Sequence, residues 1–199
     1  MSMWTRELLG TDVYHLVAAF VVYSIMGWIV ESIYMSFCNK KLTNRGFAKG
    51  PFCPIYGFGA VCGYLILSPL KGQYMKLYFA GAILATIFEY LVGRGMIKFL
   101  GQLWWDYNEK PFNYQGIICL ESTVAWGFYA IGIIEFLHGI VYRMIDRVNF
   151  AVGVRLIQVI LFVVAVDYAI QLLNVFQIDL KEKRKNMIER CQSFIARWS

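Results

Sequence analysis

Long apolar runs, separated by clusters of charge, decide what this chain can fold into. The first run covers residues 16–30 and contains no charged side chain. Across the chain 59% of the residues are hydrophobic and 16% are charged, whereas about a quarter of the residues of a soluble domain are charged. The pattern predicts an integral membrane protein, an all-α polytopic transmembrane helix bundle. One compact bundle is expected, without a second soluble domain.

Five segments are apolar enough to be read as membrane spans, since about 20 helical residues cross the ~30 Å hydrocarbon core. The second segment is short and ends at Pro69, so we expect it to be tilted, partly re-entrant, or extended by residues 51–54. Within it, Gly59 and Gly63 form a small-xxx-small pair that favours close helix packing. The first span has no cleavage signal and is expected to remain as an anchor. The predicted spans are residues 13–35, 55–70, 74–100, 117–142 and 152–176.

Lysine and arginine are concentrated between the first two spans and in the tail. Basic residues beside spans mark the cytoplasmic side, which predicts an outside N-terminus and a cytoplasmic C-terminus, in what we expect to be a bacterial cell membrane. Residues 1–178 then form the bundle, and residues 179–199 form a basic cytoplasmic tail. Apolar residues recur in the tail at helical spacing, so we predict an amphipathic helix on the inner leaflet or a simple anchor. Nothing in this charge pattern indicates binding to nucleic acid.

Acidic residues inside or beside the apolar segments are the first candidates for a functional site. A carboxylate in the bilayer costs roughly 2.5–3.5 kcal/mol, and it is tolerated when it faces the bundle interior and finds a partner. Each acid has two interpretations: a structural pair with a basic side chain such as Arg45, or a part of a polar cavity shared by several helices. The acids are Glu31, Glu89, Glu121, Glu135 and Asp167.

Two loops rich in glycine, proline, aromatic and polar residues follow the first and third spans. By the predicted topology both lie on the cytoplasmic face, where they could close over one site. The alternative is a pair of well-capped interfacial turns, and Asn113, shortly before Gly116, could cap the fourth helix. The residues predicted to bind a substrate are Glu31, Asn44, Arg45, Glu89, Asp106 and Asn113.

Enzymatic, metal and cofactor chemistry has little support in the sequence. The five cysteines form no CxxC pair, which disfavours a zinc site or a disulfide framework. His15 and His138 fall in apolar segments, where a hydrogen bond between helices is the expected role, so we predict no metal and no cofactor. Cys53 could act as a nucleophile only beside a base or a positive charge. No catalytic residue is assigned, and an enzyme is the less favoured class.

Several motifs, in this order and spacing, resemble a known family. They are Gly27-Trp28-x-x-Glu31, Asn44-Arg45-Gly46-Phe47, Gly50-Pro51-x-Cys53-Pro54-Ile55-Tyr56-Gly57, Glu89-Tyr90, Trp105-Asp106-Tyr107, Asn113 and Gly116. Together, over residues 15–140, they resemble the CmpB-type ABC-transporter permease family, which includes small transmembrane proteins of animals. Ile117 departs from the basic residue expected after the glycine, which argues against an anionic group there. The chain has no GxxxxGK[ST] phosphate loop, so the resemblance implies a partner ATPase or another energy source.

Three functions remain open from the sequence. The leading hypothesis is a small membrane transport or binding subunit with a polar site near the cytoplasmic face. The first alternative is an enzyme or binding protein for a lipid headgroup, in which Arg45 binds the phosphate and Glu31 or Asp106 acts as general base. The second alternative is a structural partner of another membrane protein. Expected partners are membrane lipids, a second copy of the chain, or a partner membrane or ATPase subunit.

Overall fold

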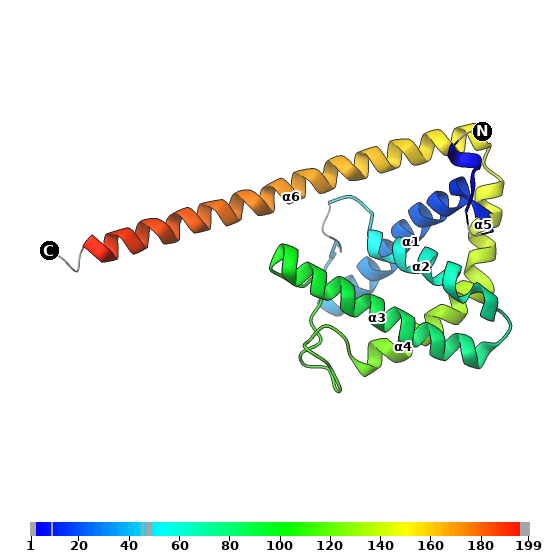
Figure 1. The fold of residues 1–199 in the computed structure, drawn as a ribbon, viewed down its shortest axis with the longest axis horizontal. Coiled ribbons are helices and arrows are strands. Elements are labelled where there is room, and N and C mark those ends of the chain that lie inside the picture. Colours follow the sequence, from blue (N-terminus) through cyan, green and yellow to red (C-terminus); the bar gives the residue numbers. More distant parts are fainter. Residues whose placement is uncertain (1–2, 9, 45, 47–48, 196–199) are drawn as a thin grey trace.

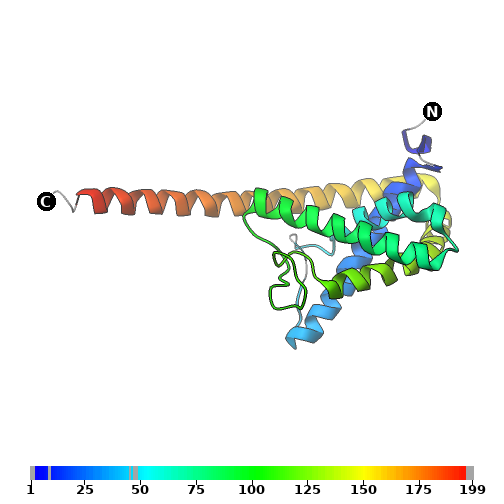
Figure 2. The same cartoon turned by 60° about the horizontal axis from the view of Figure 1, so that its bottom comes forward.

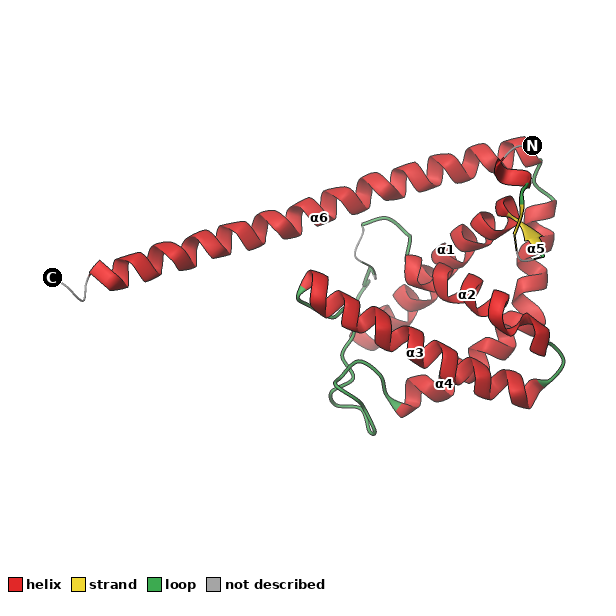
Figure 3. Ribbon diagram, in the orientation of Figure 1, coloured by secondary structure: helices red, strands yellow, loops and turns green. Residues whose placement is uncertain are grey.

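The computed structural model describes residues 3–8, 10–44, 46 and 49–195, with side chains described as far as residue 174. Nearly all of the regular structure is helical, as Figure 3 shows. One short hairpin near the N-terminus pairs β1 (Glu7–Leu8) with β2 (Thr11–Asp12). The helices are α1 (Val13–Asn39), α2 (Pro54–Leu67), α3 (Tyr74–Leu100), α4 (Leu120–Ile131), α5 (His138–Asp146) and α6 (Phe150–Ile195). Short helical turns lie at Met3–Thr5 and Ser68–Leu70, and a π-helical turn, Gly132–Leu137, joins α4 to α5.

The predicted fold class is confirmed. Within the described residues, four helical stretches are long and apolar enough to cross a membrane: Val13–Asn39, Tyr74–Leu100, Leu120–Asp146 and Phe150–Asn174. The second predicted segment is a shorter apolar helix, Pro54–Leu70. The fourth segment begins later than predicted, at Leu120, because Ile117 belongs to the preceding loop. The chain is therefore a polytopic membrane protein with four long spans and one shorter apolar helix.

Glycines set the spacing between α1 and α2, which run antiparallel (Figure 1). A Cβ atom at Gly27 would overlap the Tyr56 ring, and one at Gly57 would overlap Ser24. The predicted packing pair behaves differently, because a Cβ at Gly63 meets nothing within 4 Å and one at Gly59 makes an ordinary contact with Phe88. Close approach thus depends on Gly27 and Gly57 and not on the pair singled out from the sequence.

The first loop, residues 40–53, returns deep into the bundle before α2 begins. The backbone N–H of Cys53 donates to the Ser24 carbonyl at 3.1 Å, so α2 starts beside the middle of α1. Ser24 lies fifteen residues before the end of α1, which is about 22 Å along the helix axis. Irregular backbone at that depth needs protein cover, and Phe52 and Cys53 are both buried. This re-entry explains why the second helix is too short to match the others.

The second loop, residues 101–119, leaves α3 at the same end of the molecule as the first loop. Figures 1 and 2 show both loops there, while the N-terminus and the α2–α3 and α5–α6 connections lie at the opposite end. We call these the loop end and the N-terminal end. The prediction that both loops share one face is therefore confirmed.

The last helix, α6, extends well past the bundle (Figures 1 and 2). Its 46 residues correspond to about 69 Å, more than twice the thickness of a hydrocarbon core. The predicted boundary between residues 178 and 179 falls inside this unbroken helix, so the described tail continues on the same axis as the last span. Side chains of the tail lie outside the described set, and its amphipathic face stays a prediction.

Candidate functional site

A buried carboxylate, Glu89 of α3, forms the centre of the candidate site. Glu89 is 6% exposed. Three neutral groups donate hydrogen bonds to it: the Tyr107 hydroxyl to Oε1 at 3.1 Å, and the Ser122 hydroxyl and the Trp126 Nε1–H to Oε2 at 3.2 and 3.1 Å. These donors come from the second loop and from α4. Glu89 therefore holds together three segments at the loop end.

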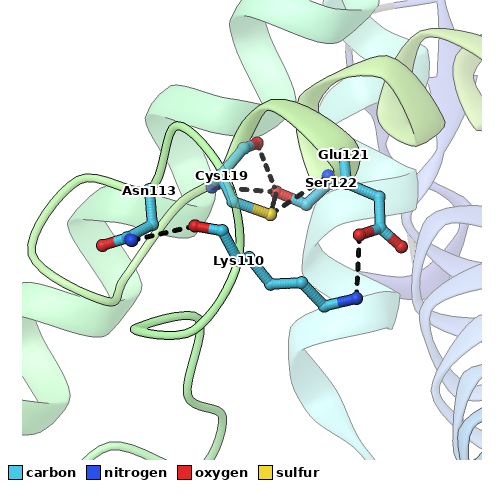
Figure 4. Close-up of polar contacts among 5 residues, drawn as sticks. All are labelled: Lys110, Asn113, Cys119, Glu121 and Ser122. Carbon is cyan, nitrogen blue, oxygen red and sulfur yellow. Dashed lines mark hydrogen bonds and ion pairs between the residues drawn. The ribbon is translucent and has the colours of Figure 1, made fainter.

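The start of α4 places two of these donors. Cys119 is the N-cap, and its side chain and backbone exchange hydrogen bonds with Ser122, as Figure 4 shows. Trp126 follows Ser122 by four residues and so lies on the same face of the helix. The Ser122 hydroxyl also lies 2.9 Å from the Cys119 carbonyl. One hydroxyl proton can serve only one acceptor at a time, so Ser122 has two alternative acceptors.

A glycine in α3 lets this helix approach the second loop closely. A Cβ at Gly93, one turn after Glu89, would overlap Ile117 and crowd Trp105. Ile117 is fully buried, and its carbonyl accepts a hydrogen bond from Trp105 Nε1 at 2.7 Å. The residue that departs from the family pattern is thus part of the hydrophobic contact beneath the site.

Glu31 of α1 is bound in a similar way by a second tyrosine. The Tyr56 hydroxyl, two residues after the start of α2, donates to Glu31 Oε2 at 2.9 Å. The two acids also act on one group, because burial first, and then the charges of Glu89 and Glu31, raise the pKa of the Tyr107 phenol above its ordinary value. Glu31 and Glu89 therefore both lie close enough to Tyr107 to affect its pKa.

The first loop is attached beside Glu31 through Asn44. Trp28 Nε1 donates to Asn44 Oδ1 at 2.7 Å, and Asn44 Nδ2 donates to the Lys49 carbonyl at 2.9 Å. Arg45 lies outside the described residues, so the predicted Glu31–Arg45 pair stays a prediction. Asn44 is thereby placed next to the α1 face that carries Glu31.

Asp106 and Asn113 make local contacts within the second loop. Asp106 is exposed and accepts from the backbone N–H and the side-chain amide of Asn108. Asn113 donates to the Asn108 and Lys110 carbonyls and accepts from the Gly116 N–H (the Asn113–Lys110 bond is drawn in Figure 4). The prediction that Asn113 caps the fourth helix is wrong, because α4 begins later and Cys119 caps it.

Three further acids occupy other places. Glu121 forms an exposed ion pair with Lys110 at 2.8 Å (Figure 4), and this hydrogen bond raises the pKa of Lys110. Asp167 of α6 accepts from the Gly50 N–H of the first loop at 2.8 Å. Glu135 accepts from the Gly72 N–H at 2.6 Å, at the N-terminal end. Of the five acids, Glu31 and Glu89 are the two that share a site.

Both histidines connect helices, as predicted. His15 of α1 contacts Asp12 at 2.7 Å and Asp146 of α5 at 2.9 Å. His138 is buried and contacts the Tyr23 hydroxyl at 3.1 Å. A cavity of about 900 Å³ borders Asp12, His15 and Asp146. It lies at the N-terminal end, away from Glu31 and Glu89.

Sequence reasoning missed Ser122 and Trp126 as partners of Glu89. Their four-residue spacing on a helix was the available signal, but it does not identify the residue that they face. Tyr56 and Tyr107 belong to the sequence motifs, but nothing in the sequence indicates that they bind Glu31 and Glu89.

Comparison with protein families gives one match. The family model described as "Putative ABC-transporter type IV" matches residues 18–172. Searches of curated proteins and of solved structures gave no match. The matched range includes both tyrosine–carboxylate contacts and both loops.

Proposed function

Because this chain belongs to the family described as "Putative ABC-transporter type IV", we propose that it is a small transport subunit with a polar site at its loop end. Family membership and the apolar helices give the membrane and transport-related role. The proposal adds the location of the site, between α1, α2, α3 and the two loops.

One observation carries the proposal: each of two carboxylates on separate membrane helices is bound by a tyrosine at or next to a loop. Tyr56 binds Glu31 at 2.9 Å and Tyr107 binds Glu89 at 3.1 Å. Burying a carboxylate costs free energy, and well-packed apolar residues often replace such buried polar groups without loss of stability. Polar residues at this depth therefore favour a functional role over a purely structural one.

The orientation and partners follow from the charges. We place the loop end and the C-terminal tail, residues 179–199, in the cytoplasm, since lysine and arginine are concentrated there. The sequence has no GxxxxGK[ST] motif, so the proposed energy source is a separate ATPase subunit or an ion gradient. A homo-oligomer and surrounding lipid complete the proposed assembly.

The lipid-headgroup hypothesis depended on Arg45 as the phosphate ligand. Arg45 lies outside the described residues. Of the two suggested general bases, Asp106 is bound to Asn108 at the surface of the second loop, and Glu31 is bound by the Tyr56 hydroxyl. No described contact favours lipid chemistry over transport, so transport is the function we propose.

A comparison of cells that contain or lack the protein tests this proposal without knowledge of the substrate. Intracellular solutes and phospholipids are measured by mass spectrometry with wild type, Tyr107→Phe and Tyr114→Phe. Tyr107→Phe removes a hydroxyl that binds Glu89, whereas Tyr114 is an exposed tyrosine of the same loop. We expect one class of solute to change with wild type and Tyr114→Phe, and to change at least threefold less with Tyr107→Phe.

Two outcomes would contradict the proposal. A change confined to phospholipid composition would indicate lipid chemistry. No change in any solute class, with the protein present in the membrane, would support the structural-partner hypothesis instead.

A further inference from the structure

We propose that Glu89 is a proton-binding site, which takes up one proton as the second loop loosens from α3 and releases it as the loop binds again. This inference rests on the proposed transport function for its biological meaning. The binding of the proton itself rests on the geometry around Glu89 and can be measured separately.

The network around Glu89 accommodates the ionised carboxylate. Tyr107, Ser122 and Trp126 supply three donors to its two oxygens, at 3.1, 3.2 and 3.1 Å. Among the described residues all of these hydrogen-bond partners are neutral. The carboxylate therefore has hydrogen bonds without a cation, which leaves one negative charge in a buried position. A proton is the smallest species that removes this charge.

The same network also accommodates the protonated acid. The Trp126 N–H can only donate, but a hydroxyl can donate or accept. Ser122 has a second acceptor, the Cys119 carbonyl at 2.9 Å. When a proton arrives, one O–H bond forms at Glu89 Oε2, and the Ser122 hydroxyl turns to the Cys119 carbonyl. The new Glu89 O–H then donates to Ser122 Oγ, and no other proton is transferred.

Other titratable groups near Glu89 come from each neighbouring segment. Tyr107 of the second loop binds Glu89 directly, and Tyr107 in turn lies close enough to Glu31 of α1 and to the N-cap Cys119 for both to affect its pKa. Tyr56 of α2 binds Glu31. On α4, Glu121 is paired with Lys110 at the surface. These groups are acids or neutral hydroxyl and thiol groups, apart from the exposed Lys110. Because these groups place no positive charge beside Glu89 among the described residues, they favour binding of a proton there and disfavour binding of a second anion.

Proton binding is linked to the second loop through Tyr107. A hydrogen bond from a phenol to a carboxylate is stronger than one to a neutral carboxylic acid. Uptake of the proton therefore weakens the contact that holds the second loop to α3, and release of the proton restores it. This gives the loop end two states that differ by one proton.

A pH titration of the full-length protein in phosphatidylcholine nanodiscs tests the site. Infrared difference spectroscopy follows the C=O stretch of a protonated carboxyl group, and the fluorescence of Trp126 follows its hydrogen bond to Glu89. We expect a titrating carboxyl band in wild type that is absent in Glu89→Gln and retained in Glu121→Gln, the matched surface acid. The Trp126 signal, taken as the difference from Trp126→Phe, should titrate with the same midpoint.

A second variant keeps the proposal testable if Glu89→Gln fails to fold. Trp126→Phe removes a donor that stabilises the ionised form more than the protonated form, so the midpoint of the carboxyl band should move to higher pH by about 1 unit. An unchanged band in Glu89→Gln, or an unchanged midpoint in Trp126→Phe, would overturn the proton site. If instead the band titrates as expected while no solute changes in cells, the proton site stands and the transport function fails.

Discussion

Replacing Gly27 by alanine tests whether the α1–α2 contact positions the site. In the native protein the Tyr56 ring lies against the bare backbone of Gly27, and the Tyr56 hydroxyl reaches Glu31 at 2.9 Å. The added methyl group would overlap three atoms of the Tyr56 side chain, including Cβ and Cγ, which cannot move without moving α2. The helices must therefore separate, and the Tyr56 hydroxyl moves away from Glu31.

The size of the effect follows from three contributions. Overpacking costs about 1–3 kcal/mol, and the lost hydrogen bond to a partly exposed carboxylate costs about 1.5 kcal/mol. Alanine is better than glycine inside a helix by about 1 kcal/mol, which partly offsets these losses. We therefore expect the free energy of unfolding to fall by about 2.5 kcal/mol. For a chain of this size the melting temperature should fall by about 5–10 °C.

The assay is thermal unfolding in nanodiscs, with Gly63→Ala as the matched control. A Cβ at Gly63 of α2 meets nothing within 4 Å, so its melting temperature should stay the same or rise slightly. Tyr56→Phe should destabilise wild type but cost little in the Gly27→Ala background, because the hydrogen bond is already lost there. A Gly27→Ala protein that melts with or above wild type, or equal effects of Tyr56→Phe in both backgrounds, would refute the reasoning.

Two further predictions concern contacts at the edge of the site. Asp167→Leu should speed tryptic cleavage after Lys49, because it removes the acceptor of the Gly50 N–H. Asp167→Asn retains an acceptor oxygen, so this variant should be cleaved as slowly as wild type. Equal cleavage rates for the two variants would contradict this role of Asp167. The Lys110–Glu121 pair raises the pKa of Lys110 in the folded protein, so its contribution is present at neutral pH and is lost only as the pH rises through that raised value. The melting temperatures of wild type and Glu121→Gln should therefore differ by the same small amount at pH 6 and at pH 8. If the difference in melting temperature changes between pH 6 and pH 8, the ion pair does not stay intact across this range.

The arrangement of spans could be predicted because it depends on local patterns. Apolar runs identify the long helices, and alternation of consecutive spans then places the two loops at one end. The same logic brought Glu31 and Glu89 together, since each lies within the last third to half of a helix that ends at that face. These inferences needed no knowledge of which side chains touch.

The contacts that define the site could not be predicted in this way. Ser122 and Trp126 reach Glu89 from 33 and 37 residues away, and this pairing depends on how α4 rotates against α3. The re-entry of the first loop could not be predicted either, because the backbone hydrogen bond from Cys53 to Ser24 joins two residues that share no sequence motif. Asp106 and Asn113 illustrate the converse case, in which polar loop residues satisfy the backbone of their own loop.

The re-entrant loop gives the two acids different roles. Glu31 lies one helical turn from Trp28, which binds the first loop through Asn44, and α6 contacts the same loop through Asp167. Glu89 is more deeply enclosed and contacts the second loop and α4. Under the proposed function we therefore expect α6 to act on the first loop through Asp167, and the charge on Glu89 to act on the second loop through Tyr107. Under the proposed function, two loops held by different contacts would allow a substrate to be admitted at one step and retained at the next.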